Sequence, residues 1–309
     1  MPTALVTGVA GFIGSHLAKA LLHRGYDVHG VDNFATGREQ NLNSLRPNDN
    51  FVFYEADIRD ADTMADVSQG ADYVFHQAAD SSVPRSIDNP VTTSDVNCTG
   101  TATVLEAARK ADVDTVVVAS SSSVYGSTER LPKVESMIEQ PESPYALSKH
   151  YTEKLALQAS DLYDIDTAAL RYFNIFGPRQ DPNGDYAAVI PKFISLMLDG
   201  ERPVIYGDGE QSRDFTFIEN AVQANICAAE GDATGEAFNV GTGGRITVNE
   251  LVDALNDHLG TDLDPIYDDP RPGDVRHSHA DISKARAHLD YEPTVDFATG
   301  LGRTVPSYS

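Results

Sequence analysis

The stretch TALVTGVAGFIGSHLAKALLHRG, residues 3–25, decides the fold of this chain. It opens with a short apolar run, residues 3–7, which is typical of a buried parallel strand. Apolar residues then recur at helical spacing, at Phe12, Ile13, Leu17, Ala20 and Leu21. A strand that passes into a helix through a glycine-rich segment predicts a βα turn.

Three glycines give this turn a chemical purpose. Gly8 allows a tight turn, Gly11 lets the backbone approach a pyrophosphate, and Gly14 lets the helix pack close to the strand. The unpaired N–H groups and the dipole of the helix favour phosphate charge. A second predicted strand, residues 27–31, ends at Asp32, where an acid accepts hydrogen bonds from an adenosine ribose. The combination predicts a dinucleotide site rather than a plain strand–helix turn.

The same region predicts which dinucleotide binds. Asp32 would repel a 2′-phosphate, and the sequence DNFATG has no cation before Arg38. A site for NADP would place a cation beside the ribose 2′ oxygen. We therefore expect NAD rather than NADP.

Length and composition bound the remaining possibilities. The 309 residues suffice for one large α/β domain with a smaller partner. No apolar run reaches membrane-spanning length and no basic-then-apolar leader precedes the first strand, so we expect a soluble, cytoplasmic protein with no membrane partner. Cys98 and Cys227 are too few and too far apart for a metal site, and the nine histidines, His277 and His279 included, lack zinc spacing. No metal is expected.

The charge of the chain is strongly negative. Its 47 acidic residues outnumber 23 basic ones, for a formal net charge of −24. Such a charge repels nucleic-acid phosphates, which argues against a nucleic-acid partner. It also destabilises the folded state by self-repulsion unless salt screens it. One hypothesis is a protein adapted to a salt-rich cytoplasm, as in halophilic microbes; an ordinary acidic enzyme is the alternative.

Strands and helices alternate along the first part of the chain. Further predicted strands cover residues 51–57, 71–79, 114–123 and 166–174, and helical stretches include residues 104–111 and 145–162. This alternation predicts the α/β class, with a doubly wound parallel (Rossmann) sheet that binds ligands at the carboxyl ends of its strands.

The pattern loosens after Asn174, where proline and glycine become frequent and elements shorten. This change indicates a second, smaller α/β lobe near the C-terminus. Residues 213–240 again read as helix and strand, and return to the first lobe. The expected domains are an NAD-binding Rossmann domain of residues 1–173 with about 212–243, and a substrate-binding lobe of residues 174–211 and 244–309.

Tyr145 and Lys149 lie four residues apart in SPYALSKHY, where Ser143 and Pro144 predict a helix start. The pair therefore shares one helix face. A free tyrosine has a pKa of about 10, which a nearby ammonium or an oxidised nicotinamide lowers. In isolation such a pair is typical of a helix surface. Here the strand that ends at residues 120–123 brings four serine hydroxyls to the edge that faces the cofactor.

These motifs together resemble the extended short-chain dehydrogenase/reductase family, and within it the nucleotide-sugar 4-epimerases. The matching stretches span essentially the whole chain: GVAGFIG, DNFATG, HQAA, DVNCTGT, SSSSVYG, SPYALSK, RYFNIFGPRQDPNG, GDGEQSRDFTFIEN and RPGDVRHS. The resemblance implies an isomerase with tightly bound NAD that works through a transient 4-keto sugar. It implies Tyr145 as the catalytic base and Ser121, four residues before Tyr125, as the catalytic hydroxyl. Lys149 is implied to lower the Tyr145 pKa and to hold the nicotinamide ribose.

The resemblance also implies binding residues. For the cofactor these are Gly8, Gly11, Phe12, Ile13, Gly14, Asp32, Asn33, Asp57, Ile58, Ala78, Ala79 and Asn97, with Tyr145 and Lys149. For the UDP-sugar they are Ser81, Ser82, Ser122, Ser123, Asn174, Ala188, Val189, Tyr206, Arg213, Arg271 and Ser278. Arg213 and Arg271 match phosphate-binding arginines, which suit bidentate contacts. Surface arginines paired with carboxylates are the alternative in so acidic a chain.

One local difference bears on the reaction. Sugar-nucleotide 4,6-dehydratases resemble this chain but carry Thr-Asp-Glu before Val-Tyr-Gly, and UDP-glucuronate decarboxylases carry a glutamate there. This chain has Ser121, Ser122 and Ser123, without an acid for elimination. The expected reaction is therefore 4-epimerisation; a dehydratase, a decarboxylase or a catalytically inactive nucleotide-sugar-binding protein are the alternatives.

Ser278 bears on the substrate, because family members restricted to glucose carry a bulky tyrosine there. A serine leaves room for a 2-acetamido group, and AAVIPKFI and RQDPNG resemble members that use UDP-N-acetylhexosamines or their uronic acids. We expect the pair UDP-GlcNAc and UDP-GalNAc, with UDP-Glc and UDP-Gal as second substrates and the corresponding uronates open. The family is often dimeric through helices near residues 91–111 and 145–162, which implies a homodimer.

Overall fold

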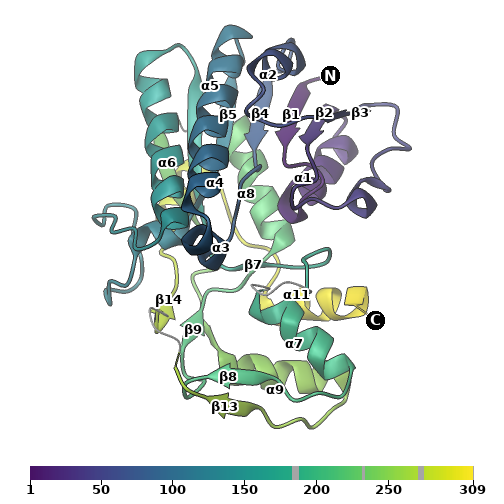
Figure 1. Cartoon of the computed structure of the whole chain (residues 1–309), viewed down its shortest axis with the longest axis vertical. Helices are drawn as coiled ribbons and strands as arrows, with labels where there is room; N and C mark the ends of the chain where they lie inside the picture. The colour runs from purple at the N-terminus through teal and green to yellow at the C-terminus, as the bar shows by residue number, and fades with distance from the viewer. Residues whose placement is uncertain (183–187, 232–233, 271–274, 309) are drawn as a thin grey trace.

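The structure is a computed structural model that describes residues 1–182, 188–231, 234–270 and 275–308. Its centre is a seven-stranded sheet in the order β11-β6-β5-β4-β1-β2-β3, parallel throughout (Figure 1). The strands are β1 (Thr3–Thr7), β2 (Asp27–Asp32), β3 (Phe51–Glu55), β4 (Tyr73–His76), β5 (Thr115–Ser121), β6 (Asp166–Tyr172) and β11 (Glu236–Val240). The α/β class and the doubly wound parallel sheet expected from the sequence are confirmed.

Several strands end earlier than the apolar pattern predicts. The strand predicted over residues 51–57 stops at Glu55, and Asp57 accepts the backbone N–H of Arg59 at 2.9 Å. The strand predicted over 114–123 stops at Ser121, whose hydroxyl accepts the Ser123 N–H and starts the short helix η3 (Ser122–Tyr125). In both cases a side-chain oxygen accepts a backbone N–H two residues further along the chain, a local bond that competes with continuation of the strand.

Helices cover both faces of the sheet. Along β1, Ala4 and Val6 belong to one core while Leu5 belongs to the other, as alternation along a strand requires. The first core includes residues of α1 (Phe12–His23) and α8 (Ile218–Glu230). The second includes residues of α2 (Ala61–Val67), α5 (Gly100–Lys110) and α6 (Pro144–Leu162).

The smaller elements lie where the chain leaves the carboxyl end of β6. Figure 1 shows α7, β8, α9 and β13 gathered together beyond one end of the sheet. Their bounds are α7 (Val189–Leu198), β8 (Val204–Tyr206), α9 (Val248–Leu259) and β13 (Ile266–Asp268). The remaining elements are η1 (Glu39–Leu42), α3 (Val83–Asp88), α4 (Pro90–Ser94), η2 (Asp95–Thr99), β7 (Ile175–Phe176), β9 (Ser212–Arg213), β10 (Thr216–Phe217), β12 (Ile246–Thr247), β14 (His277–Ser278), α10 (Ser283–Leu289), α11 (Phe297–Thr304) and η4 (Val305–Tyr308).

α6 is the helix on which the predicted catalytic pair lies. It starts where the sequence predicts, because Ser143 Oγ accepts the Ala146 N–H at 3.1 Å and Pro144 occupies the first turn. Lys149 and Glu153, one turn apart, are both buried against the sheet. Among the described residues, α6 and the other helices do not combine the length and the apolar character that crossing a bilayer requires.

A buried ion cluster joins α6 to β6. Arg171 on β6 is 1% exposed and donates to both carboxylate oxygens of Glu153, at 2.6 and 2.8 Å. Its guanidinium also reaches Glu139 at 2.6 Å and the Tyr125 hydroxyl at 2.8 Å. Burial by itself would raise the pKa of Glu153, but the hydrogen bonds and charge of Arg171, with smaller contributions from Ser120 and Lys154, together lower it. The buried Arg171 cation and Glu153 carboxylate stabilise each other, and removing either one would leave the other charge unpaired inside the protein.

Replacing Arg171 therefore tests this cluster. We expect Arg171→Ala to lower the free energy of unfolding by about 3–5 kcal/mol, because Glu153 would remain buried without its main partner. The matched control is Arg303→Ala, which breaks a pair with Glu219 whose side chains are 50% and 55% exposed. That change should cost less than about 1 kcal/mol. Denaturant titrations measure the loss of unfolding free energy in both variants. Equal losses would contradict the claim that Arg171→Ala leaves the Glu153 charge buried without a partner.

Candidate active site

The glycine-rich turn between β1 and α1 has no room for side chains at two positions. A Cβ at Gly8, whose φ is +69°, would lie 2.7 Å from the Ala78 backbone nitrogen. A Cβ at Gly14 would lie 2.2 Å from the Gly8 carbonyl oxygen, so α1 starts close against β1. Gly11 is the N-cap of α1 and makes no side-chain hydrogen bond. The N–H groups of the first turn, at Phe12 and Ile13, have no partner within the helix and suit a phosphate.

Asp32 lies at the end of β2 beside this turn. Its carboxylate accepts the backbone N–H groups of Ala10 at 2.9 Å and Phe34 at 2.8 Å. Burial raises the pKa of Asp32, and these two hydrogen bonds oppose the shift. The carboxylate keeps acceptor capacity for ribose hydroxyls. The tight turn, the helix N-terminus and the carboxylate therefore fit a dinucleotide.

Two of the residues predicted to bind the cofactor, Asn33 and Asp57, contact each other. Asn33 Nδ2 donates to Asp57 at 2.9 Å, and Arg59 donates to both Asp57 oxygens at 2.8 and 2.6 Å. The Arg59 hydrogen bonds lower the pKa of Asp57 to about 2. Ile58 is 6% exposed, and a Cβ at Gly100 would lie 2.4 Å from its side chain. Ile58 is therefore placed to meet a ligand through its backbone rather than its side chain.

The segment after β4 leads from the glycine turn toward α6. Ala78 and Ala79 are half-buried there. Asn97 is 1% exposed; its amide oxygen accepts the Asp80 N–H at 2.7 Å and its amide nitrogen donates to Ser148 Oγ at 2.9 Å. Asn97 thus ties this segment to α6, and its predicted contact with the nicotinamide side stays a prediction.

The three predicted catalytic side chains lie together at the carboxyl end of β5. Ser121 ends the strand, and its hydroxyl approaches the Tyr145 side chain. Lys149 lies one turn further along α6, is 4% exposed, and donates from Nζ to the Ala119 carbonyl at 2.9 Å. Strand β5 and helix α6 are therefore joined directly beside the tyrosine.

Burial controls the protonation of this group. It raises the pKa of Tyr145, with the Ser121 hydrogen bond acting against it and Asp80 acting with it. Burial also lowers the pKa of Lys149 to about 8. In the protein alone the Tyr145 pKa is thus raised, whereas the resemblance implied that Lys149 lowers it. The reason is that the ammonium is directed at the β5 backbone, and loss of hydration penalises the phenolate.

Four further predicted serines occupy turns near this group. Ser123 Oγ donates to Ser121 Oγ at 2.9 Å, and Ser122 precedes it in η3. Ser82 Oγ caps α3 by accepting a backbone N–H at 3.2 Å, while Ser81 is exposed. These hydroxyls lie on the segments that follow β4 and β5, at the same edge of the sheet.

A pocket of about 330 Å³ lies next to this edge, among α7, β8 and β9. Its lining includes the predicted substrate residues Asn174, Ala188, Val189, Tyr206 and Arg213. It also includes residues that the sequence analysis missed: Pro84, Gln180, Lys192, Phe193 and Gln211. The stretch AAVIPKFI carried a signal for Lys192, since the lysine lies one helical turn after Val189.

The remaining predicted substrate residues lie beside the pocket or cannot be placed. Ser278 on β14 is the register partner of Arg213 on β9, outside the pocket lining. The Arg213 guanidinium donates to the Ser212 and Arg276 carbonyls at 3.0 and 3.2 Å. Arg271 lies outside the described residues.

The sequence analysis also missed Glu153, which supports the site from behind. Glu153 accepts Ser120 Oγ at 2.8 Å, which joins β5 to α6 a second time. Its position four residues after Lys149 in sequence was the available signal. Tyr125 is fully buried and donates to Asn239 Oδ1 at 2.6 Å, so it belongs to the core rather than to the reacting group.

The cysteines and histidines take no part in a metal site that the structure describes. Cys98 and Cys227 are free thiols. His277 Nδ1 lies 2.8 Å from Ser212 Oγ. In the part of the chain with described coordinates, no three His, Cys, Asp or Glu side chains gather where they could hold a metal ion.

Comparison with known proteins places this geometry in context. Residues 4–241 match the sequence profile of the NAD dependent epimerase/dehydratase family. A UDP-glucose 4-epimerase of Mycolicibacterium smegmatis is 41% identical over 97% of this chain and 96% of its own length. The structure of a UDP-N-acetylglucosamine 4-epimerase from Methanobrevibacter ruminantium, in complex with UDP-N-acetylmuramic acid, superposes with a TM-score of 0.96 at 42% identity, over 99% of this chain and 98% of the other.

A third similar protein was solved with a dinucleotide. It is a UDP-glucuronic acid 4-epimerase from Bacillus cereus, in complex with UDP-glucuronic acid and NAD. It superposes with a TM-score of 0.92 at 33% identity, over 99% of this chain and 98% of the other.

The buried Lys149 ammonium makes a prediction about stability and pH. Below about pH 8 the lysine is charged in both the folded and the unfolded chain, so the folded state bears the full penalty of burial. As pH rises toward about 10.5, the folded protein has lost this proton while the unfolded chain still holds it, so the penalty fades. The gain in stability of Lys149→Met over wild type should therefore shrink by roughly 3 kcal/mol over that window.

Denaturant titrations across this pH range measure the difference. Lys110→Met, at a side chain that is 59% exposed, is the control: water reaches this ammonium in the folded protein, so its stability difference from wild type should change far less over the range. If the difference in unfolding free energy between Lys149→Met and wild type changes as little as that of the control, a buried Lys149 ammonium is contradicted.

Proposed function

The chain belongs to the NAD dependent epimerase/dehydratase family, and we propose that it interconverts a UDP-sugar and its C4 epimer with bound NAD. In this proposal UDP-GlcNAc and UDP-GalNAc are the preferred pair, with UDP-Glc and UDP-Gal as a second. The observation that carries it is the placement of Ser121, at the end of β5, beside Tyr145 and Lys149 of α6, at the sheet edge that also holds the glycine turn and Asp32.

The proposed chemistry is proton transfer by Tyr145 at the C4 oxygen. Bound NAD would supply a hydride acceptor that gives the hydride back to the 4-keto sugar, and when oxidised it would supply a positive charge that lowers the pKa of a nearby phenol. Tyr145 takes the proton of the C4 hydroxyl while Ser121 hydrogen-bonds with the same oxygen. After the 4-keto sugar has turned over, Tyr145 returns the proton to the C4 oxygen. Lys149 holds the ribose and keeps α6 against β5.

The surroundings of Tyr145 support epimerisation rather than elimination. Ser122 and Ser123 stand where elimination would need an acid. Asp80 raises the Tyr145 pKa, yet its carboxylate accepts Arg85 at 2.9 Å and Thr93 at 2.6 Å. That carboxylate is engaged by protein donors and is poorly placed to exchange protons with a substrate.

Cations at the pocket support a nucleotide diphosphate as the anchor. Arg213 and Lys192 line the pocket of a chain whose formal net charge is −24. We assign the diphosphate to Arg213 together with Arg271, and to Lys192 a supporting charge. Ala188, Val189 and Tyr206 provide apolar and ring surface for the uridine, and Asn174 an amide for the diphosphate.

Product analysis tests the reaction. Wild-type protein at high salt is incubated with UDP-GlcNAc, UDP-Glc, and the uronates of both. We expect NMR to show a C4 epimer and mass spectrometry to show unchanged mass, with UDP-GlcNAc converted fastest. Loss of water or carbon dioxide would instead identify a dehydratase or a decarboxylase, and no conversion a binding protein.

Ser278 is proposed as the residue that admits the 2-acetamido group. Its small side chain is on the register partner of Arg213 in the β9–β14 pair, next to a residue that we assign to the diphosphate. The similarity to a UDP-N-acetylglucosamine 4-epimerase supports the same preference.

We therefore expect Ser278→Tyr to lower kcat/KM for UDP-GlcNAc at least tenfold (about 1.4 kcal/mol) while leaving UDP-Glc within a few-fold of wild type. Ser278→Ala is the control, because it removes the hydroxyl without adding bulk. The role in specificity is wrong if both substrates lose equally in the tyrosine variant.

A homodimer is proposed through α5 and α6. Large apolar side chains are exposed along α6 and just after it: Leu147, Tyr151, Leu162 and Tyr163, at 60%, 45%, 64% and 48%. A shallow hollow between α5 and α6 includes Leu105, Leu155 and Leu162 in its lining. Exposed apolar surface of this kind marks association sites in soluble proteins. Light scattering measures the mass directly.

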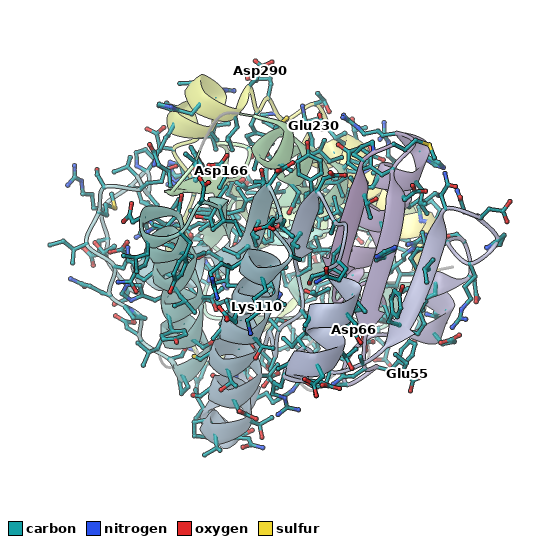
Figure 2. The ribbon with its side chains drawn as sticks, turned by 90° about the horizontal axis from the view of Figure 1, so that it is seen from above. Glu55, Asp66, Lys110, Asp166, Glu230 and Asp290 are labelled. Atoms are coloured by element: carbon teal, nitrogen blue, oxygen red, sulfur yellow. The ribbon has the colours of Figure 1, made fainter. Side chains whose placement is uncertain are left out.

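Salt adaptation is the last part of the proposal. Figure 2 shows Glu55, Asp66, Asp166, Glu230 and Asp290 spread around the molecule, with Lys110 among them. All six are exposed, and the five acidic ones do not form a single patch. The Debye length, over which charges still act on one another, shortens from about 10 Å at roughly 0.1 M salt to about 3 Å at roughly 1 M.

Raising KCl from dilute buffer to about 1 M should therefore increase the free energy of unfolding. Thermal and denaturant unfolding at several concentrations measure this, with an equal concentration range of a neutral osmolyte as the control. A free energy of unfolding that is as high in dilute buffer as in about 1 M KCl would contradict salt adaptation.

A further inference from the structure

The chain crosses the sheet edge immediately after β7. In Figure 1 it runs from β7 past the lower end of α1 toward α11. Residues 178–181, here named the clasp, make up the part that touches the cofactor-binding half. The chain comes from β6, and the clasp ends near β2. These two strands lie on opposite sides of the central strand pair β4 and β1. A ligand at this switch point lies along the path of the clasp.

Three contacts join the clasp to the dinucleotide-binding elements. His16 of α1 hydrogen-bonds through Nε2 with the Pro178 carbonyl at 3.0 Å. Arg179 Nη2 donates to Ser44 Oγ at 3.1 Å. Asp181 forms an ion pair with Arg38. A fourth contact, from the Tyr308 hydroxyl to the Gln180 carbonyl at 2.6 Å, supports the clasp from η4.

The partners of the clasp belong to the elements that fit the dinucleotide. His16 lies one turn after Phe12, at the start of α1. Arg38 donates its backbone N–H to the Ala10 carbonyl at 2.9 Å, within the glycine-rich turn. Gly37, next to it, is so close to Asp32 that a Cβ there would lie 2.7 Å from the carboxylate. The clasp therefore bridges the phosphate end and the ribose end of the site.

The conformation of the clasp depends on these contacts. Arg179 has a φ of +71°, a left-handed conformation that a residue with a side chain keeps only when its surroundings hold it. Burial lowers the pKa of Arg179, and one guanidinium nitrogen is buried without a hydrogen-bond partner among the described residues. A cation held this way favours an anion close by.

We propose that residues 178–181 retain NAD in the site between turnovers, with Asp181 and Arg38 as the pair that closes the clasp. This inference rests on the proposed function, in which each reaction cycle regenerates NAD and release of the cofactor gains nothing. The Arg38 and Asp181 side chains are 34% and 49% exposed, so the pair alone is weak, and retention comes from contacts that must open together.

The exit rate of the cofactor tests the proposal. Purified protein is loaded with radiolabelled NAD, chased with unlabelled NAD at fixed KCl, and followed by rapid filtration. Ser44→Ala/Asp181→Asn should release the label about tenfold faster than wild type, because two of the three contacts are weakened. The matched control is Glu292→Gln, which breaks the exposed Arg286–Glu292 pair (2.7 Å) away from the site and should release it at the wild-type rate.

A charge exchange separates the clasp from a general loss of stability. Arg38→Asp/Asp181→Arg restores the pair in reverse and should return the exit rate toward wild type, with melting temperatures recorded for every variant. Wild-type exit from Ser44→Ala/Asp181→Asn, or fast exit from the exchanged pair, overturns the clasp. The proposed function fails separately, if wild-type protein holds no NAD or converts no UDP-sugar.

Discussion

The Lys149 ammonium and the Ala119 carbonyl, 2.9 Å apart inside the protein, form the contact on which the site depends. Water cannot hydrate this ammonium, so its hydrogen bond to the strand is what makes burial tolerable. The contact fixes α6 against the end of β5, and Glu153 with Ser120 repeats the connection one turn later. Tyr145 is held beside Ser121 as a consequence.

In two places, buried and partly buried charges of this acidic protein pair with charges of opposite sign. Arg171 contacts Glu153 and Glu139 behind β5, and Arg59 pairs with Asp57 after the end of β3. The pocket, by contrast, collects Arg213 and Lys192 on its wall. A diphosphate bound in this pocket would therefore meet cations locally although the protein has a large net negative charge, because interactions between exposed charges fade beyond about 10 Å at roughly 0.1 M salt.

The sequence predicted the elements that follow from periodicity and topology. Alternating apolar runs located the strands, and the rule that ligands bind at carboxyl ends brought Ser121 and Tyr145 to one edge. Three features could not be predicted. The direction of the Tyr145 pKa depends on burial, the Arg171–Glu153 pair joins residues that no periodicity relates, and strand ends depend on local bonds such as that of Ser121 to Ser123. Each is set by neighbours in space rather than in sequence.

The central claim is that the Tyr145 phenol exchanges the C4 proton of a UDP-sugar. Turnover of Tyr145→Phe, measured by NMR on UDP-GlcNAc with NAD content and UDP affinity recorded beside it, tests this most directly. The account predicts turnover at least about a hundredfold below wild type, because positioned proton transfer contributes that much or more, with both binding readouts unchanged. Near-normal turnover in a variant that still binds NAD and UDP would contradict it.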